Sequence, residues 1–160
     1  APERAMWLET RPEGVAGEAA SLFVRPAVGL YGVNMSDPQL GDTVVVYGSG
    51  LIGLGVIAAC AHRGCQVIAV DIRDDRLEVA KTLGADVVIN GADEDVAAAV
   101  KKVTPAMADV VFESTGIPAC LDEAITAKRR FPCIFCRRTG GSSPCSSPAT
   151  TGWRPAGAPW

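Results

Sequence analysis

Residues 41–53 read GDTVVVYGSGLIG, a run of β-branched and aromatic residues that passes directly into a glycine-rich turn. The run at 43–47 is too short for a helix and is bounded by turn residues, so it predicts a strand covered on both faces of a sheet. The apolar residues after the turn predict a helix. A G-x-G-x-x-G pattern is informative about function only in this context of strand, turn and helix.

The three glycines of the pattern are Gly48, Gly50 and Gly53. Gly48 stands where the backbone has to turn sharply, and Gly50 has no side chain to keep a pyrophosphate away from the main chain. The free N–H groups and the dipole at the start of the helix attract the negative charge of such a group. Because Gly53 also allows the helix to pack close to the strand, the pattern predicts a phosphate-binding turn.

A carboxylate at the end of the next strand supports dinucleotide binding. Residues 66–71 form a second β-branched run, which ends in Asp71, 18 residues after Gly53. In dinucleotide-binding folds, about 20 residues separate the glycine turn from the carboxylate that accepts hydrogen bonds from the adenosine ribose. The glycine turn and Asp71 together predict a dinucleotide site.

Strands and helices alternate four times along the chain, which predicts an α/β fold. Such alternation is typical of a Rossmann-type parallel sheet with helices on both faces and with its ligand at the carboxyl ends of the strands. We expect the sheet to end after about four strands and to be followed by an irregular C-terminal tail. An earlier helical segment at 18–35 is predicted to break at Arg25-Pro26. The predicted strands are 43–47, 66–71, 86–90 and 109–113, and the predicted helices begin near residues 51, 74, 96 and 118.

The charge of the chain changes abruptly near residue 128. Residues 1–127 contain all 18 acidic residues and nine of the 15 basic ones, whereas residues 128–160 contain six basic residues and no acidic one. A change this sharp predicts a boundary. We expect an irregular lead-in at 1–17, an NAD(P)-binding domain at 18–127 and a basic tail of low order at 128–160.

The tail is rich in Ser, Pro, Gly, Arg, Cys and Trp and has no periodicity. This composition is typical of GC-rich coding sequence that is read out of frame. We therefore hypothesise that the reading frame is lost near residues 126–130. Retranslation of the nucleotide sequence tests the idea, because one of the other two frames should continue with a glycine turn and an apolar strand.

Composition excludes several classes of protein. With 48% hydrophobic and 21% charged residues, the chain can bury a globular core. No apolar run reaches the roughly 18 residues of a membrane span, and the N-terminus lacks a signal-peptide pattern. We therefore expect a cytoplasmic protein without a membrane partner. The basic residues of the tail have neither a fold nor an aromatic platform beside them, so nucleic-acid binding is not predicted.

Five segments follow one another in a characteristic order: 41–53, 70–77, 80–81, 83–86 and 109–116. They resemble the nucleotide-binding domain of medium-chain dehydrogenases of the zinc-type alcohol dehydrogenase group, and the resemblance extends over about residues 18–127. It implies NAD(H) as the cofactor and hydride transfer to or from an alcohol or polyol. In the full-length form of such a protein, it also implies zinc and allows a homo-oligomer.

The resemblance implies roles for four residues near the phosphates and the bend of the cofactor. The peptide N–H groups of Leu51 and Ile52 would hold the pyrophosphate. Thr115 and Gly116, in the turn after the fourth predicted strand, would lie beside the bend of the cofactor. These residues complete a predicted site at the carboxyl ends of the strands.

The resemblance also implies how the adenosine would be bound. Asp71 would bind its ribose, Ile72 would flank the adenine, and Arg76 stands where the family often has a basic residue near that ribose. The Asp71 carboxylate would repel the 2′-phosphate of NADP, which favours NAD. Arg73 and Arg76 could offset part of this repulsion, so NADP stays the less favoured alternative.

The chain departs from the family in its catalytic parts. A catalytic domain with zinc-binding cysteine and histidine residues normally comes first, and residues 1–17 offer only a remnant of it. Arg25-Pro26 stands where related members often have Glu-Pro, and an arginine cannot bind a metal. His62 ends a predicted helix at the surface, while Cys133 and Cys136 have only half the ligands of a zinc site. We therefore predict no catalytic residue and no metal ligand in this chain.

Two other functions fit parts of the sequence. A non-catalytic module that senses NAD and reports to a partner would have the same alternation of strands and helices. A methyltransferase would use an acid such as Asp71 on the ribose of S-adenosylmethionine. The segment 109–116 favours the dehydrogenase over the sensing module, and Gly53 with its direct entry into a helix favours a dinucleotide over S-adenosylmethionine.

Overall fold

The fold is seen in a computed structural model, which describes residue 11 and residues 13–126. Helices and strands alternate along the described chain, as the sequence predicted. The helices are α1 (Gly17–Leu22), α2 (Val24–Ser36), α3 (Leu51–His62), α4 (Asp74–Thr82), α5 (Val96–Val103) and α6 (Pro118–Thr126). The strands are β1 (Thr43–Tyr47), β2 (Gln66–Asp71), β3 (Val87–Asn90) and β4 (Val110–Glu113).

The four strands form one parallel sheet in the order β3-β2-β1-β4. From β1 the chain first winds outward to β2 and β3, and then returns to place β4 on the other side of β1. The strand order therefore reverses at β1, and ligands of doubly wound sheets bind at the carboxyl ends of the strands beside such a point. The prediction of a Rossmann-type parallel sheet is confirmed.

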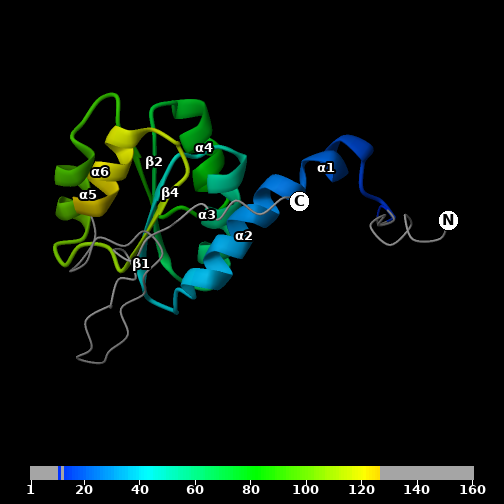
Figure 1. Ribbon diagram of the computed structural model, residues 1–160, viewed down its shortest axis with the longest axis horizontal. Coiled ribbons are helices and arrows are strands. Elements are labelled where there is room, and N and C mark those ends of the chain that lie inside the picture. The colour runs from blue at the N-terminus through cyan, green and yellow to red at the C-terminus, as the bar shows by residue number, and fades with distance from the viewer. Residues whose placement is uncertain (1–10, 12, 127–160) are drawn as a thin grey trace, which may run out of the picture.

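Helices cover both faces of the sheet, as Figure 1 shows, with α5 and α6 on one face and α2, α3 and α4 on the other. Val44 and Val46 of β1 pack in the core beneath α3, whereas Val45 and Tyr47 pack toward α5 and α6. All four side chains are buried, because a parallel strand inside a two-faced sheet has no face in water. This explains why β1 is an unbroken β-branched and aromatic run.

The break before α2 lies at Phe23, and the prediction that placed it at Arg25-Pro26 is wrong. Pro26 falls in the first turn of α2, where backbone N–H groups have no partner within the helix. Proline is tolerated there, because it removes no helical hydrogen bond. The helix therefore continues through Pro26 to Ser36.

Close packing of α2 on α3 fixes the position of the helix that follows the glycine turn. A Cβ on Gly29 would lie 2.4 Å from the carbonyl oxygen of Ile52. A Cβ on Gly55 would lie 2.6 Å from the backbone of Pro26. The two glycines thus bring the backbones of α2 and α3 together.

Some of the expected features fall outside this part of the chain. The basic tail at 128–160 lies entirely outside the described residues, and so does most of the lead-in at 1–17. Among the helices from α1 to α6, none is both long and apolar enough to span a membrane.

Candidate functional site

The glycine turn after β1 is shaped by contacts that exclude side chains at two positions. Gly48 has φ +90°, and a Cβ there would lie 2.9 Å from Cγ2 of Thr115. A Cβ on Gly53 would lie 1.8 Å from the carbonyl oxygen of Gly48, so α3 could not keep its present place. At Gly50, by contrast, a Cβ would meet no atom of the described residues within 4 Å. The turn is thus tightly packed on its protein side and open at Gly50.

The first turn of α3 offers unpaired amides beside Gly50. The N–H of Leu54 is bonded to the carbonyl of Gly50 at 2.8 Å, and no side chain caps the helix. The amides of Leu51 and Ile52 precede this first helical bond and have no partner among the described residues. Such amides, together with the helix dipole, form an anion-binding site.

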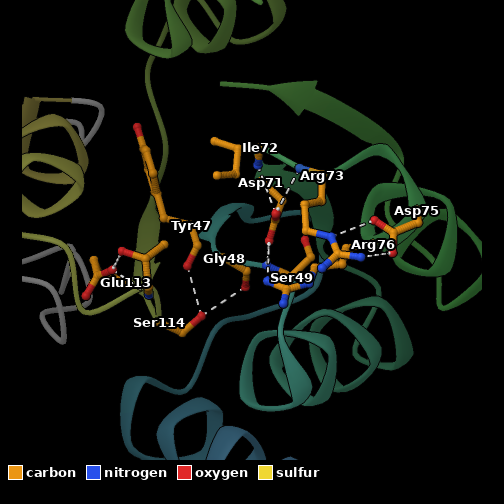
Figure 2. A network of polar contacts seen from close by, with 11 residues as sticks. Tyr47, Gly48, Ser49, Asp71, Ile72, Arg73, Asp75, Arg76, Glu113 and Ser114 are labelled. Carbon is orange, nitrogen blue, oxygen red and sulfur yellow. Dashed lines mark hydrogen bonds and ion pairs between the residues drawn. The ribbon is translucent and has the colours of Figure 1, made fainter. Parts of the chain in front are cut away.

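Asp71 joins the end of β2 to the glycine turn, as Figure 2 shows. Its Oδ2 accepts a hydrogen bond from the amide of Ser49 at 2.7 Å. Its Oδ1 accepts from the amides of Ile72 and Arg73 at 2.8 and 3.1 Å. An ionised carboxylate has about four acceptor sites. Three of them are filled by backbone amides, so a ligand hydroxyl can still be bound.

Two arginines lie near Asp71, but they contact different carboxylates. Nη1 of Arg76 lies 3.8 Å from Oδ2 of Asp71, so this cation is held at the carboxylate. Arg73 instead forms two hydrogen bonds to Asp75, at 2.9 and 2.6 Å, and these bonds lower the pKa of the Asp75 carboxyl. Both partners of the Arg73–Asp75 pair are exposed. Arg76, and not Arg73, is therefore the cation that faces the candidate site.

The turn after β4 is bonded to the glycine turn. The amide of Ser114 donates to the carbonyl of Tyr47 at 2.9 Å, and its hydroxyl lies 2.9 Å from the carbonyl oxygens of both Tyr47 and Gly48. The Glu113 carboxylate accepts from the amide of Thr115 at 2.6 Å. The bonds of Ser114 hold the two turns together at the point where the strand order reverses, whereas the bond to Glu113 lies within the turn after β4.

A cavity of about 270 Å³ lies where these segments meet. Six of the ten predicted cofactor-binding residues line it: Gly48, Gly50, Asp71, Ile72, Arg76 and Thr115. The other four are not part of its lining. Leu51 and Ile52 are exposed in the first turn of α3, Gly53 packs against Gly48, and Gly116 follows at φ +73° with its amide bonded to Glu113. The structure thus brings the predicted residues to one edge of the sheet, in the segments at and after the ends of β1, β2 and β4 and in the first turns of α3 and α4.

The cavity has further lining residues that are not among the ten predicted cofactor-binding residues. They are Tyr47, Val70, Gly91, Val96, Ser114, Ile117, Cys120 and Glu123. The helical residues among them come from α5 and α6, and a sequence pattern does not show how far these helices reach toward the glycine turn. Tyr47 did give a signal, because it is the aromatic residue of a strand that otherwise holds valines and one threonine, and its ring carries a hydroxyl.

The hydroxyl of Tyr47 is a buried polar group without a hydrogen-bond partner among the described residues. Only 1% of the residue is exposed. Burial raises the pKa of this phenol far above its ordinary value, and the nearby Glu123 carboxylate raises it further. Tyr47 therefore keeps its proton and can donate a hydrogen bond.

The described residues do not fit a zinc ion. Between residues 13 and 126, no three histidine, cysteine, aspartate or glutamate side chains form a group that could hold a metal. Cys60 and Cys65 are buried, and burial raises the pKa of the Cys60 thiol to about 12, whereas zinc binds the thiolate. His62 is exposed at the end of α3. No chemical step through zinc is therefore derived from these residues.

Comparison with known proteins shows that the sequence is similar to dehydrogenases. Residues 52–135 match the family model of the zinc-binding dehydrogenases. The (R,R)-butanediol dehydrogenase of Bacillus subtilis (strain 168) is 37% identical over 115 residues, which cover 71% of this chain and 33% of the relative. The sorbitol dehydrogenase of Gallus gallus is 36% identical over 122 residues, which cover 74% of this chain and 34% of the relative.

Solved structures share the fold as well. The structure of an alcohol dehydrogenase from Escherichia coli CFT073, complexed with the cofactor NADH, superimposes with a TM-score of 0.67 at 29% identity. The match covers 75% of this chain and 36% of that structure. The chain thus spans about a third of the length of the relatives that it matches.

Proposed function

The chain belongs to the zinc-binding dehydrogenase family, and we propose that its residues 18–127 are the NAD(H)-binding domain of an alcohol or polyol dehydrogenase. The family that the sequence resembles is thereby confirmed. The cofactor, the substrate class and the reaction are parts of the proposal, because the chain spans only about a third of its relatives.

One observation supports the cofactor site above all others. The Asp71 carboxylate is fixed by the Ser49 amide within the glycine turn, and both segments border the same cavity as the open Gly50. A ribose-binding acid and a phosphate-binding turn are thereby held side by side. A dinucleotide needs this arrangement, because its ribose and pyrophosphate are covalently joined.

We assign the parts of the cofactor to neighbouring groups. The amides of Leu51 and Ile52 bind the pyrophosphate, for which Gly50 leaves room. Asp71 accepts a hydrogen bond from the adenosine ribose through its remaining acceptor site. The adenine lies in the cavity beside Ile72, which is 67% exposed and so has apolar surface to offer a base.

The assignment favours NAD over NADP. A 2′-phosphate would be placed against the Asp71 carboxylate, which is 7% exposed and therefore weakly screened by water. Arg76 is near enough to compensate in part, but it already pairs with Asp71. Arg73 is bonded to Asp75 instead of to the site.

When bound, NAD supplies the chemistry of the family, the acceptance or donation of a hydride at its nicotinamide. The described residues bind and orient the adenosine and pyrophosphate. Thr115 and Gly116 lie in the turn after β4, where the chain could contact the bend of the cofactor. An alcohol or polyol substrate, a homo-oligomer and a cytoplasmic location belong to the same proposal for the full-length protein.

A titration of the 160-residue chain with three ligands tests the proposal. NADH fluorescence should report saturable binding, whereas NADPH should bind at least about tenfold more weakly, the factor that corresponds to 1.4 kcal/mol. S-adenosylmethionine should not compete with NADH. Binding of S-adenosylmethionine in preference to NADH would indicate the methyltransferase alternative and contradict the proposal.

A further inference from the structure

The Tyr47 hydroxyl makes no stabilising hydrogen bond within the described fold. It is buried and unpartnered among residues 13–126, whereas the residue belongs to the same buried hydrophobic cluster as Val45, Val70 and Val96. An unsatisfied buried hydroxyl has lost its hydrogen bonds to water and regained none, so it destabilises the folded state. A phenylalanine would provide the same ring without this cost. A bound ligand could satisfy the hydroxyl, since none of the described residues does so.

The position of Tyr47 places it on the adenosine side of the proposed cofactor site. In the sheet, Tyr47 of β1 is paired with Val70 of β2, the residue directly before Asp71. Tyr47 also lines the same cavity as Asp71 and Ile72. Figure 2 shows its side chain extending away from Ser114, which binds the backbone of the glycine turn. A base beside Ile72, with its ribose at Asp71, would therefore reach the neighbourhood of Tyr47.

We propose that the Tyr47 hydroxyl donates a hydrogen bond to a ring nitrogen of the adenine and so helps to select the adenine end of the cofactor. The inference rests on the proposed function, because it needs a dinucleotide in this cavity. The phenol keeps its proton at neutral pH, so it acts as a donor, and the ring nitrogens of adenine are acceptors. Asp71 then fixes the ribose, and Tyr47 fixes the base.

The inference predicts opposite effects of one substitution on stability and on binding. Tyr47→Phe removes the unsatisfied hydroxyl from the ligand-free protein, so its Tm should rise by about 2–4 °C. The same substitution removes a hydrogen bond from the complex, so the Kd for NADH should rise about 3- to 10-fold. A hydroxyl with a purely structural role would not produce this pair of changes.

The experiment compares the wild-type chain with Tyr47→Phe and with Tyr31→Phe. Tyr31 lies on α2, is 65% exposed and does not line the cavity, so its substitution controls for the loss of a phenol elsewhere. Tm is measured without ligand, and Kd is measured for NADH and for ADP-ribose, which keeps the adenine but lacks the nicotinamide. Tyr47→Phe should weaken both ligands by the same factor, and Tyr31→Phe should weaken neither.

The outcomes separate this inference from the proposed function. If the wild-type chain binds neither NADH nor ADP-ribose, the proposed function fails and the inference fails with it. If the wild-type chain binds both and Tyr47→Phe binds them equally well, the proposed function stands and the inference is wrong. An unchanged affinity with a raised Tm would mean that the hydroxyl is unsatisfied in the complex too, which also overturns the inference.

Discussion

The carboxylate of Asp71 accepts a hydrogen bond from the amide of Ser49 at 2.7 Å, across 22 residues of sequence. This bond ties the end of β2 to the turn that follows β1. The acid that is proposed to bind ribose therefore also positions the turn that is proposed to bind phosphate. Substitution of Asp71 should affect both the cofactor and the shape of its site.

The first prediction concerns Asp71→Asn. The variant loses the charge that strengthens the hydrogen bond to ribose, and its amide group cannot satisfy all three backbone donors. NADH affinity should fall about tenfold or more, since hydrogen bonds to charged groups contribute about 1.5–3 kcal/mol. NADPH affinity should fall less or rise, because the repulsion of the 2′-phosphate is removed. Fluorescence titrations with both cofactors measure the change in preference.

Asp122→Asn is the matched control for Asp71→Asn, because Asp122 is exposed on α6 and does not line the cavity. It should leave both affinities unchanged. An Asp71→Asn variant that remains folded and keeps the NADH-to-NADPH preference of the wild type would show that the carboxylate does not set cofactor choice.

The second prediction concerns Gly53→Ala, which should act on stability. The new Cβ would lie 1.8 Å from the carbonyl oxygen of Gly48, so either α3 or the glycine turn has to move. Such overpacking costs typically about 1–3 kcal/mol. Urea unfolding followed by circular dichroism should show a lowered free energy of unfolding. A variant as stable as the wild type would mean that α3 does not need this close approach.

The third prediction concerns Gly50→Ala, which should act on binding. Gly50 has φ −77°, and a Cβ added there would meet no atom within 4 Å among the described residues, so alanine fits the folded chain. As the N-cap of α3 it should change the free energy of unfolding by no more than about 1 kcal/mol. Its methyl group would nevertheless occupy the space through which the pyrophosphate approaches the backbone, so NADH affinity should fall. Unchanged NADH binding would place the pyrophosphate elsewhere.

Local chemistry explains why so much of the fold could be predicted from sequence. The β-branched runs give β1 and β2 their bounds, because each strand is buried on both faces and is closed by turn residues. The left-handed backbone at Gly48 and the close approach at Gly53 are requirements that the sequence shows directly as glycines. The carboxyl ends of parallel strands meet at one edge, which is why Asp71 could be placed near the glycine turn.

Long-range packing explains what could not be predicted. Cys120 and Glu123 reach the cavity only because α6 packs on the same face of the sheet as Tyr47, and no local pattern gives that distance. The place of the break before α2 depended on whether Pro26 fell in the interior of a helix, where it would break it, or in the first turn, where it is tolerated. The pairing of Arg73 with Asp75 and of Arg76 with Asp71 depends on side-chain directions at the start of α4.

The fourth prediction concerns pH. Burial raises the pKa of Cys60 from about 9 to about 12, so the unfolded chain releases this proton at a lower pH than the folded chain does. Above pH 9 the unfolded state therefore binds fewer protons, and the free energy of unfolding should fall as the pH rises toward 12. Cys60→Ala should reduce this dependence, which thermal unfolding at pH 8, 9 and 10 can measure. An equally steep loss of stability in Cys60→Ala would assign the effect to other groups.

The central claim is that a nicotinamide dinucleotide binds at the glycine turn. The most direct measurement is a titration of the ¹⁵N-labelled 160-residue chain with NADH, followed by two-dimensional NMR. The amide signals of Gly50, Leu51 and Ile52 should shift most, together with those of Ile72 and Thr115. No saturable shifts, or shifts confined to residues away from the carboxyl ends of β1, β2 and β4, would contradict the claim.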